Sequence, residues 1–227
     1  MNRGRAFGRA VFALVWKDLL AELRSLEVIS AMLVFALTVI LVFNFALELT
    51  PRLRAELSSG VLWVSLAFSG TLGLNRSLGQ EKDRGCLDGL LLAPVDRLAI
   101  FFGKALANWL FMLLCLVILL PVLSVLYDPR LLQAGVWGVA LLGSLGYVVV
   151  GTLLASMAVQ ARTRDVLLPI LLFPVLLPAL VASVKASSGF LLGLPGNEIS
   201  PWLIVLIVYD LIFLALALFV FDTILEE

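Results

Sequence analysis

"NRSLGQEKDRGCLDGLLLAPVDRLAIFFGK", residues 75–104, holds nine of the thirty-two charged residues in this chain of 227 residues. Apolar runs long enough to cross a bilayer lie directly on both sides of this charged strip. An ordinary connection between two helices needs only a few residues. A strip of this length and charge therefore predicts a docking surface outside the membrane.

The composition indicates an integral membrane protein. Apolar residues make up 62% of the chain and the mean hydropathy is +1.12, whereas about half of a soluble domain is apolar. The formal net charge is zero, so no overall field favours nucleic acid. Histidine is absent, and the two cysteines show no metal-site or disulfide pattern. We therefore expect no cofactor bound directly, and any haem or metal chemistry would come from a partner.

Six apolar runs are close to the roughly twenty residues that a membrane-spanning helix needs. The sequence thus predicts an all-α integral membrane protein with a single transmembrane domain over residues 1–227. The predicted spans cover residues 28–47, 57–74, 105–127, 134–159, 166–184 and 202–221.

Lysine and arginine predict the orientation, because they are concentrated in cytoplasmic loops. With the N-terminus inside, the inside segments hold twelve of them: Arg3, Arg5, Arg9, Lys17, Arg24, Arg76, Lys82, Arg84, Arg97, Lys104, Arg162 and Arg164. The outside loops hold four: Arg52, Arg54, Arg130 and Lys185. Both termini and the charged strip are therefore expected to be cytoplasmic.

Residues 6–26 predict an amphipathic helix lying on the cytoplasmic leaflet before the first span. Its apolar side chains recur at helical spacing: Phe7, Val11, Leu14, Val15 and Leu19. The charged residues are expected elsewhere around the helix: Arg9, Lys17, Asp18, Glu22 and Arg24. Two interpretations stay open, a membrane anchor alone or an anchor that also docks a protein.

The charged strip itself predicts local structure. Leu87, Leu90 and Leu91 share one face of a short helix that Pro94 ends, and Asp96 is placed to cap the next helix. A mixed-sign rim typical of a protein contact flanks this face: Glu81, Lys82, Asp83, Arg84 and Asp88. The alternative is a solvated loop that folds locally. The second inside loop, with Arg162, Arg164 and Asp165, is a candidate second contact, although short basic loops need no other explanation.

Four features of the remaining chain suggest packing or movement. The glycines of residues 134–159 predict close helix packing. Pro169, Pro174 and Pro178 predict a bend in the fifth span, either static or a hinge. Asp210 lies inside the sixth span, where two interpretations stay open, a functional group or a structural hydrogen bond. Three settings are expected for its carboxyl group: protonated, paired with a neighbouring hydroxyl such as that of Tyr209, or facing another subunit. Residues 185–201 are expected to form an outer loop, or a half-buried helix or lid.

Several chemistries are excluded. The chain has no P-loop motif, no serine–histidine pair and no aspartyl dyad within the membrane, so no enzyme is expected. Its halves lack the matching interruptions of inverted-repeat transporters. What remains is a permease-like subunit whose energy arrives from outside.

Three stretches together resemble the haem exporter protein B family, the ABC-2-type permease subunit of the cytochrome c maturation complex. They are "KDLLAELRSLEVISAMLVFALTVILVFNFAL", "FSGTLGLNRSLGQEKDRGCLDGLLLAPVDRLAIFFGKALANWLF" and "VGTLLASMAVQARTRDVLLPILLFPVLLPALVAS". The resemblance implies six spans in an ABC-2, type V exporter-like fold in the cytoplasmic (inner) membrane. It also implies a separate P-loop ATPase dimer, a haem-handling membrane protein and a small accessory subunit as partners, with membrane lipids around it.

The resemblance implies a mechanism as well. The ATPase partner binds ATP, the complex handles haem, and hydrolysis drives haem export or release of a haem-loaded periplasmic chaperone. Residues 75–104 would be the coupling region, with a coupling helix between spans two and three, and residues 6–26 the elbow helix. The implied ATPase contacts are Glu81, Lys82, Asp83, Arg84, Gly85, Leu87, Asp88, Leu90, Leu91, Pro94 and Asp96. One such strip per chain favours a homodimer or paired permease on a two-fold ATPase.

Two other functions remain as alternatives. One is an ABC-2 permease for another amphiphile, such as a lipid or a polysaccharide. The other is a passive scaffold that holds a haem-handling membrane assembly together without transmitting motion.

Overall fold

The computed structural model describes residues 3–46, 51–83, 95–158 and 164–224. All regular structure in these ranges is helical, which confirms the predicted all-α fold. The elements in chain order are α1 (Arg3–Ser25), α2 (Glu27–Ala46), α3 (Pro51–Asp83), α5 (Arg97–Leu126), the short 3₁₀ helix η1 (Pro129–Leu132), α6 (Ala134–Ala158), α7 (Arg164–Leu192) and α8 (Gly196–Ile224).

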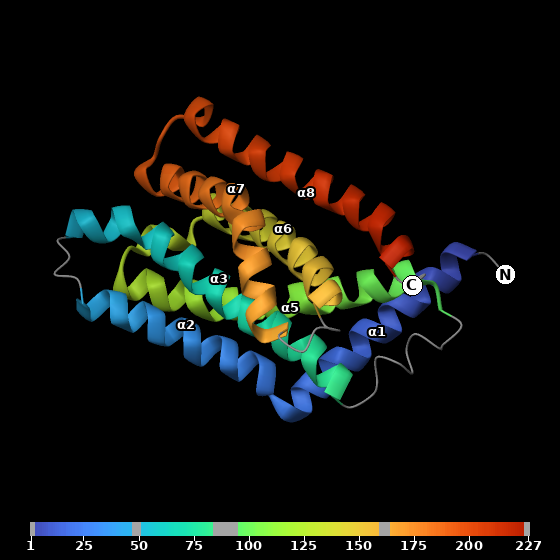
Figure 1. The fold of residues 1–227 in the computed structure, drawn as a ribbon. Helices are drawn as coiled ribbons and strands as arrows, with labels where there is room; N and C mark the ends of the chain where they lie inside the picture. Colours follow the sequence, from blue (N-terminus) through green and yellow to red (C-terminus); the bar gives the residue numbers. More distant parts are fainter. Residues whose placement is uncertain (1–2, 47–50, 84–94, 159–163, 225–227) are drawn as a thin grey trace.

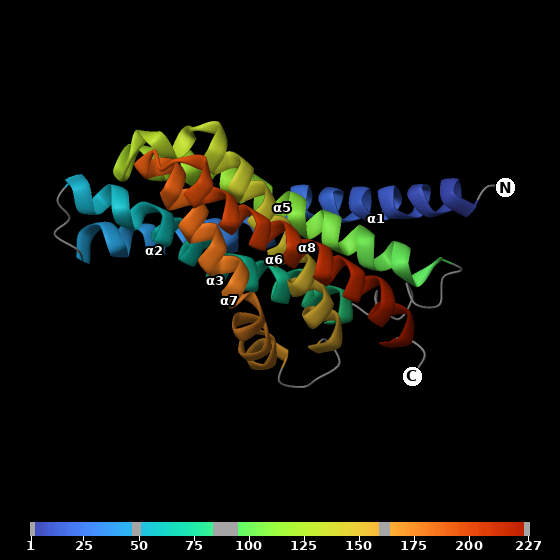
Figure 2. The same ribbon diagram turned by 90° about the horizontal axis from the view of Figure 1, so that it is seen from above.

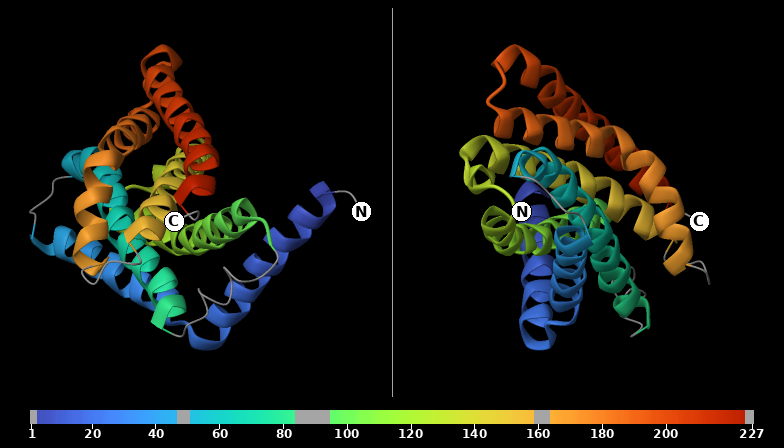
Figure 3. Two further views of the ribbon diagram at one scale, coloured as in Figure 1. Left: turned by 45° about the vertical axis from the view of Figure 1, so that its right-hand side comes forward. Right: turned by 90° about the vertical axis from the view of Figure 1, so that its left-hand side faces the viewer.

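Six of these helices are long and apolar enough to cross a membrane, as predicted. The candidate spans are Glu27–Ala46, Leu57–Ser77, Arg97–Leu126, Ala134–Ala158, Val166–Leu192 and Gly196–Phe219. In Figure 1 they run side by side, and α1 lies at one end of this bundle, packed mainly against α5. Figure 2 shows α1 beside the first part of α5, and Figure 3 gives two further views of the arrangement.

Two predicted connections are largely helical. The charged strip was predicted to lie outside the membrane up to Lys104, but α5 begins at Arg97, so the last eight residues of the strip belong to a span. Of the alternatives for residues 185–201, the ordinary loop is wrong and a helical segment is found, because α7 continues to Leu192 and α8 begins at Gly196. Their apolar residues extend the fifth and sixth spans.

Helix α6 lies at the centre of the bundle because its glycines admit neighbouring side chains. A Cβ on Gly143 would collide with Ser183 of α7 and Trp63 of α3, and one on Gly151 would collide with Leu74 of α3. Such close approach is how small residues drive helix packing in membranes. The predicted packing role is therefore confirmed for Gly143 and Gly151, whereas Gly138 is exposed with nothing within 4 Å of its Cβ position.

Helix α7 bends, as its three prolines predicted. Pro169, Pro174 and Pro178 all lie inside one continuous helix, and Figure 1 shows α7 changing direction along its length. Proline removes a backbone donor and its ring crowds the preceding turn, which explains the bend. Whether the bend moves stays a prediction.

The corner between α1 and α2 has a left-handed residue. Leu26 separates the two helices with φ of +52°, and its side chain is exposed. Leucine rarely adopts this conformation, since its Cβ crowds the backbone. Side chains of α1 and α3 nevertheless support the corner through hydrogen bonds to the first turn of α2.

Candidate functional site

The predicted ATPase contacts begin at the end of α3. Glu81, Lys82 and Asp83 form its last turn, so the helix continues beyond the apolar part of the span. The remaining predicted contacts before the next helix lie outside the described residues: Arg84, Gly85, Leu87, Asp88, Leu90, Leu91 and Pro94. The coupling helix and its contact with an ATPase therefore stay predictions.

Asp96 caps α5 as predicted. Its Oδ1 accepts a hydrogen bond from the backbone N–H of Leu98 at 3.0 Å. An aspartate here satisfies a donor that the first helical turn leaves open and favours the positive end of the helix dipole. The helix α5 thus begins at a defined residue within the charged strip.

The second predicted contact lies at the same end of the bundle. Arg164 and Asp165 begin α7, whereas Arg162 lies outside the described residues. In Figure 1 the end of α3 and the starts of α5 and α7 are directed toward the side where α1 and the end of α8 lie. We call this side the charged end of the bundle.

A buried ion pair joins α1 to α5 at the charged end. Lys104 Nζ lies 2.7 Å from Asp18 Oδ2, and Lys17 Nζ lies 3.1 Å from Asp18 Oδ1. Lys104 is 3% exposed and Asp18 is 9% exposed, whereas the side chain of Lys17 is 49% exposed. Breaking a buried pair of this kind costs much more than breaking an exposed one, because the remaining charge keeps no partner. This pair is thus a rigid link between the two helices.

Gly103 brings the two helices together beside that pair. A Cβ at this position would lie 2.8 Å from the Cβ of Leu14 on α1. Any larger residue would push α1 away from α5 and stretch the neighbouring ion pair. The sequence Gly103–Lys104 therefore combines close approach with charge pairing.

The corner between α1 and α2 is held from both sides. Glu22 of α1 accepts a hydrogen bond from the backbone N–H of Ile29 at 2.7 Å, which caps the start of α2. Arg76 of α3 donates to the carbonyl oxygen of Glu27 at 3.2 Å. Helices α1, α2, α3 and α5 are thereby joined by polar contacts at the charged end.

The placement of Asp18 and Glu22 corrects a sequence prediction. Both were expected away from the apolar face of the amphipathic helix, but both are buried. Their spacing carried the signal, because Asp18 follows Leu14 by four residues and Glu22 follows Asp18 by four, which is one helix face. The other three charged residues of this region, Arg9, Lys17 and Arg24, are exposed as expected.

Asp210 lies inside the bundle, against α6. Its side chain is 5% exposed, and a Cβ on Gly146 would collide with its Oδ1. Among the described residues neither carboxylate oxygen has a hydrogen-bond partner, and the Tyr209 hydroxyl donates to the carbonyl of Val175 at 3.1 Å. Asp210 and Tyr209 are therefore not paired with each other in the described structure, whereas a protonated carboxyl group and contact with another subunit stay predictions. Asp210 instead determines how closely α8 approaches α6.

Within the described ranges, no cluster of three or more acidic, cysteine or histidine side chains could hold a metal ion. The described polar groups of the charged end are used for holding helices together.

Comparison with known proteins identifies the chain's relatives. The family model described as CcmB protein matches residues 9–226. The heme exporter protein B of Rhodobacter capsulatus is 31% identical over 172 residues, covering 74% of this chain and 78% of the relative. That of Paracoccus denitrificans is 30% identical over 210 residues, covering 91% and 94%. That of Bradyrhizobium diazoefficiens is 28% identical over 185 residues, covering 81% and 83%. With a match over nearly its whole length, the chain belongs to the CcmB protein family.

Proposed function

We propose that this protein is the membrane permease subunit of an ABC-type complex that delivers haem for cytochrome c maturation. A separate P-loop ATPase would supply the energy, with the charged strip as its docking surface. The family match over residues 9–226 is the observation that carries this proposal. The relatives are named heme exporter protein B, which supports haem as the cargo.

The contacts at the charged end suggest how a docked ATPase would act. The strip leads directly into α5 at Asp96, and α5 is fastened to α1 by the Lys104–Asp18 pair. Displacement of the strip would therefore move α5 and α1 together, and the Glu22–Ile29 contact would carry it into α2. Nucleotide-driven closure of an ATPase pair would thus repack the spans through rigid-body shifts.

The cargo would be handled with partners. The chain has no histidine, which is the commonest axial ligand of haem. A haem-handling membrane protein would supply that ligation, and a small accessory subunit would complete the complex. Two copies of the chain would match a two-fold ATPase dimer. The site of action would be the inner membrane, with both termini cytoplasmic, and the step would be haem export or release of a haem-loaded chaperone.

The experiment is affinity purification of the tagged chain from native membranes in mild detergent, followed by ATP hydrolysis assays on the purified complex. The test variant is Asp83→Asn with Arg84→Gln, which removes two charges of the predicted docking surface. We expect normal membrane insertion, co-purification of a P-loop ATPase and weakened coupling of hydrolysis to c-type cytochrome formation. The matched control is Lys185→Gln with Glu198→Gln, exposed charges at the opposite end of the bundle.

The outcomes separate the alternatives. A chain that purifies without an ATPase contradicts the permease assignment. Normal coupling in the Asp83/Arg84 variant, with the complex intact, contradicts the docking surface and favours a scaffold. A deletion that leaves c-type cytochromes unchanged but removes a lipid or polysaccharide product would favour a permease for another amphiphile.

A further inference from the structure

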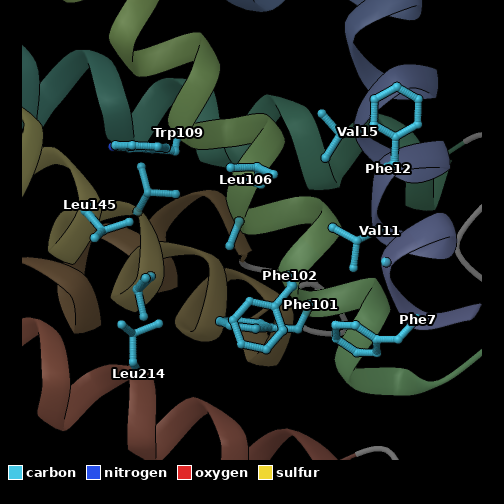
Figure 4. A pocket seen from close by; sticks show the side chains of 14 residues that line it. Phe7, Val11, Phe12, Val15, Phe101, Phe102, Leu106, Trp109, Leu145 and Leu214 are labelled. Carbon is cyan, nitrogen blue, oxygen red and sulfur yellow. The ribbon is translucent and has the colours of Figure 1, made fainter. Parts of the chain in front are cut away.

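An apolar groove of about 500 Å³ lies between α1 and α8, with α5 and α6 as its floor. Figure 4 shows side chains from all four helices converging on it. The volume falls within the range of ordinary ligand pockets. Its principal walls are Phe7 and Phe12 of α1, Phe102 and Trp109 of α5, Leu145 of α6 and Leu214 of α8.

The lining selects a hydrocarbon ligand. None of the fourteen lining residues is charged, carries a hydroxyl group or contains sulfur. The indole N–H of Trp109 is already donated to Ser144 Oγ at 3.0 Å, so the indole offers no donor to a ligand. The lining contains no histidine, cysteine, methionine or tyrosine, which are the side chains that ligate a haem iron. An acyl chain fits this lining, since a hydrocarbon needs no hydrogen-bond partners.

The charge beside the groove selects an anionic headgroup. The first seventeen residues of the chain contain Arg3, Arg5, Arg9 and Lys17 but no acidic residue. Arg9 is exposed and precedes Phe12 by three residues, so the two are neighbours on the helix surface. Phe12 stacks on Trp16 with ring centroids 6.3 Å apart, and both rings are exposed, which is typical of a membrane–water interface. Basic and aromatic residues on an interfacial helix attract anionic lipids.

We propose that this groove binds an anionic phospholipid, with an acyl chain between α1 and α8 and the phosphate near Arg9 of α1. The bound lipid fills the space between α1 and α8 and helps to hold α1 on the bundle. The site does not depend on the proposed transport function, because it follows from the groove and its charge alone.

The test uses a glycine that opens onto the groove. Gly8 lines it, and a Cβ at this position would meet nothing within 4 Å. Gly8→Leu should therefore fill the groove without displacing a helix. Gly138→Leu is the matched control, because Gly138 is exposed on α6, is equally open and lies outside the lining.

Native mass spectrometry of the purified full chain, given phosphatidylglycerol and phosphatidylcholine with identical acyl chains, measures the binding. We expect the parent protein and Gly138→Leu to bind phosphatidylglycerol in preference to phosphatidylcholine. We expect Gly8→Leu to bind phosphatidylglycerol at least ten-fold more weakly than the parent protein. Size-exclusion chromatography checks that both variants fold.

A second pair of variants tests the charge and does not depend on Gly8→Leu folding. Arg9→Gln should lower the preference for phosphatidylglycerol roughly five-fold, whereas Arg24→Gln at the other end of α1 should not. Equal binding of the two lipids by the parent protein, or unchanged lipid binding in Gly8→Leu, would overturn the site. Competition of haem for the groove, lost in Gly8→Leu, would likewise overturn it and identify a cargo site.

Discussion

The Nζ atom of Lys104 on α5 lies 2.7 Å from the Oδ2 atom of Asp18 on α1, and both side chains are buried. The two residues are separated by 86 positions in the chain, yet this pair fastens the amphipathic helix to the third span. Both partners lie where an unpaired charge would be expensive. Substitutions at this pair, at its neighbours and at Asp210 test these contacts.

The ion pair should depend strongly on both partners. Lys104→Met leaves the Asp18 carboxylate buried beside Lys17 alone, so we expect a loss of about 3–5 kcal/mol in the free energy of unfolding. Asp18→Leu combined with Lys104→Met should lose much less, because neither member of the pair is left buried without its partner. Thermal unfolding in detergent measures both. Lys17→Met is the control, with an expected change below about 1 kcal/mol, and a parent-like melting temperature for Lys104→Met would show that the pair is not desolvated.

Gly103 should tolerate no side chain. Gly103→Ala places a Cβ against the Cβ of Leu14, and overpacking of this kind costs about 1–3 kcal/mol. Leu14→Ala should fail to rescue it, because alanine keeps the Cβ that causes the collision. Gly138→Ala, where nothing lies within 4 Å, should instead gain about 0.5–1 kcal/mol as an ordinary helical glycine replacement. Equal unfolding temperatures for the two alanine variants would contradict the close approach.

Glu22 should act as a hydrogen-bond acceptor for α2. Glu22→Ala leaves the buried N–H of Ile29 without its partner, and we expect a loss of about 1–3 kcal/mol. Glu22→Gln keeps an oxygen at this position and should lose less than half of that amount. Chemical unfolding of the two variants compares them, and identical losses would indicate that the negative charge, not the acceptor, is what stabilises the corner.

Leu26 should be better replaced by glycine. Its φ of +52° is unfavourable for leucine by roughly 1–2 kcal/mol, and its exposed side chain contributes little packing inside the protein. Leu26→Gly should therefore raise the unfolding temperature. Leu23→Gly, an equally exposed leucine inside α1, should lower it because glycine weakens helices. A lower unfolding temperature for Leu26→Gly would indicate that this leucine anchors the corner in the bilayer.

Asp210 and Gly146 should be coupled across α6 and α8. Gly146→Ala directs a Cβ at Asp210 Oδ1 and should destabilise the protein, whereas Asp210→Ala removes the atoms that this Cβ meets. The double variant should thus be more stable than the sum of the two single changes predicts, by at least 0.5 kcal/mol. Asp210→Asn should retain stability, since the carboxylate oxygens have no partner to lose among the described residues. Additive effects in this cycle would contradict direct contact.

Much of the fold is determined by the sequence alone. Six apolar runs, three prolines in the fifth span and the glycines of the fourth predict the number of spans, the bend of α7 and the close packing around α6. Asp96 was identifiable as a cap from the neighbouring Pro94. These features depend on hydrophobicity and on backbone chemistry, which act locally and are therefore visible in a linear sequence.

The tertiary structure decided what the charged residues do. The sequence places Lys104 in the charged strip and Asp18 on the polar side of α1. Local sequence shows no partner for either charge, so each is predicted to lie at the surface. Only the crossing of α1 over α5 brings Gly103 against Leu14 and Lys104 against Asp18. The same holds for Asp210, whose position against Gly146 depends on how α8 packs on α6. A buried charge is stable only with suitable surroundings, and the packing of distant helices provides them.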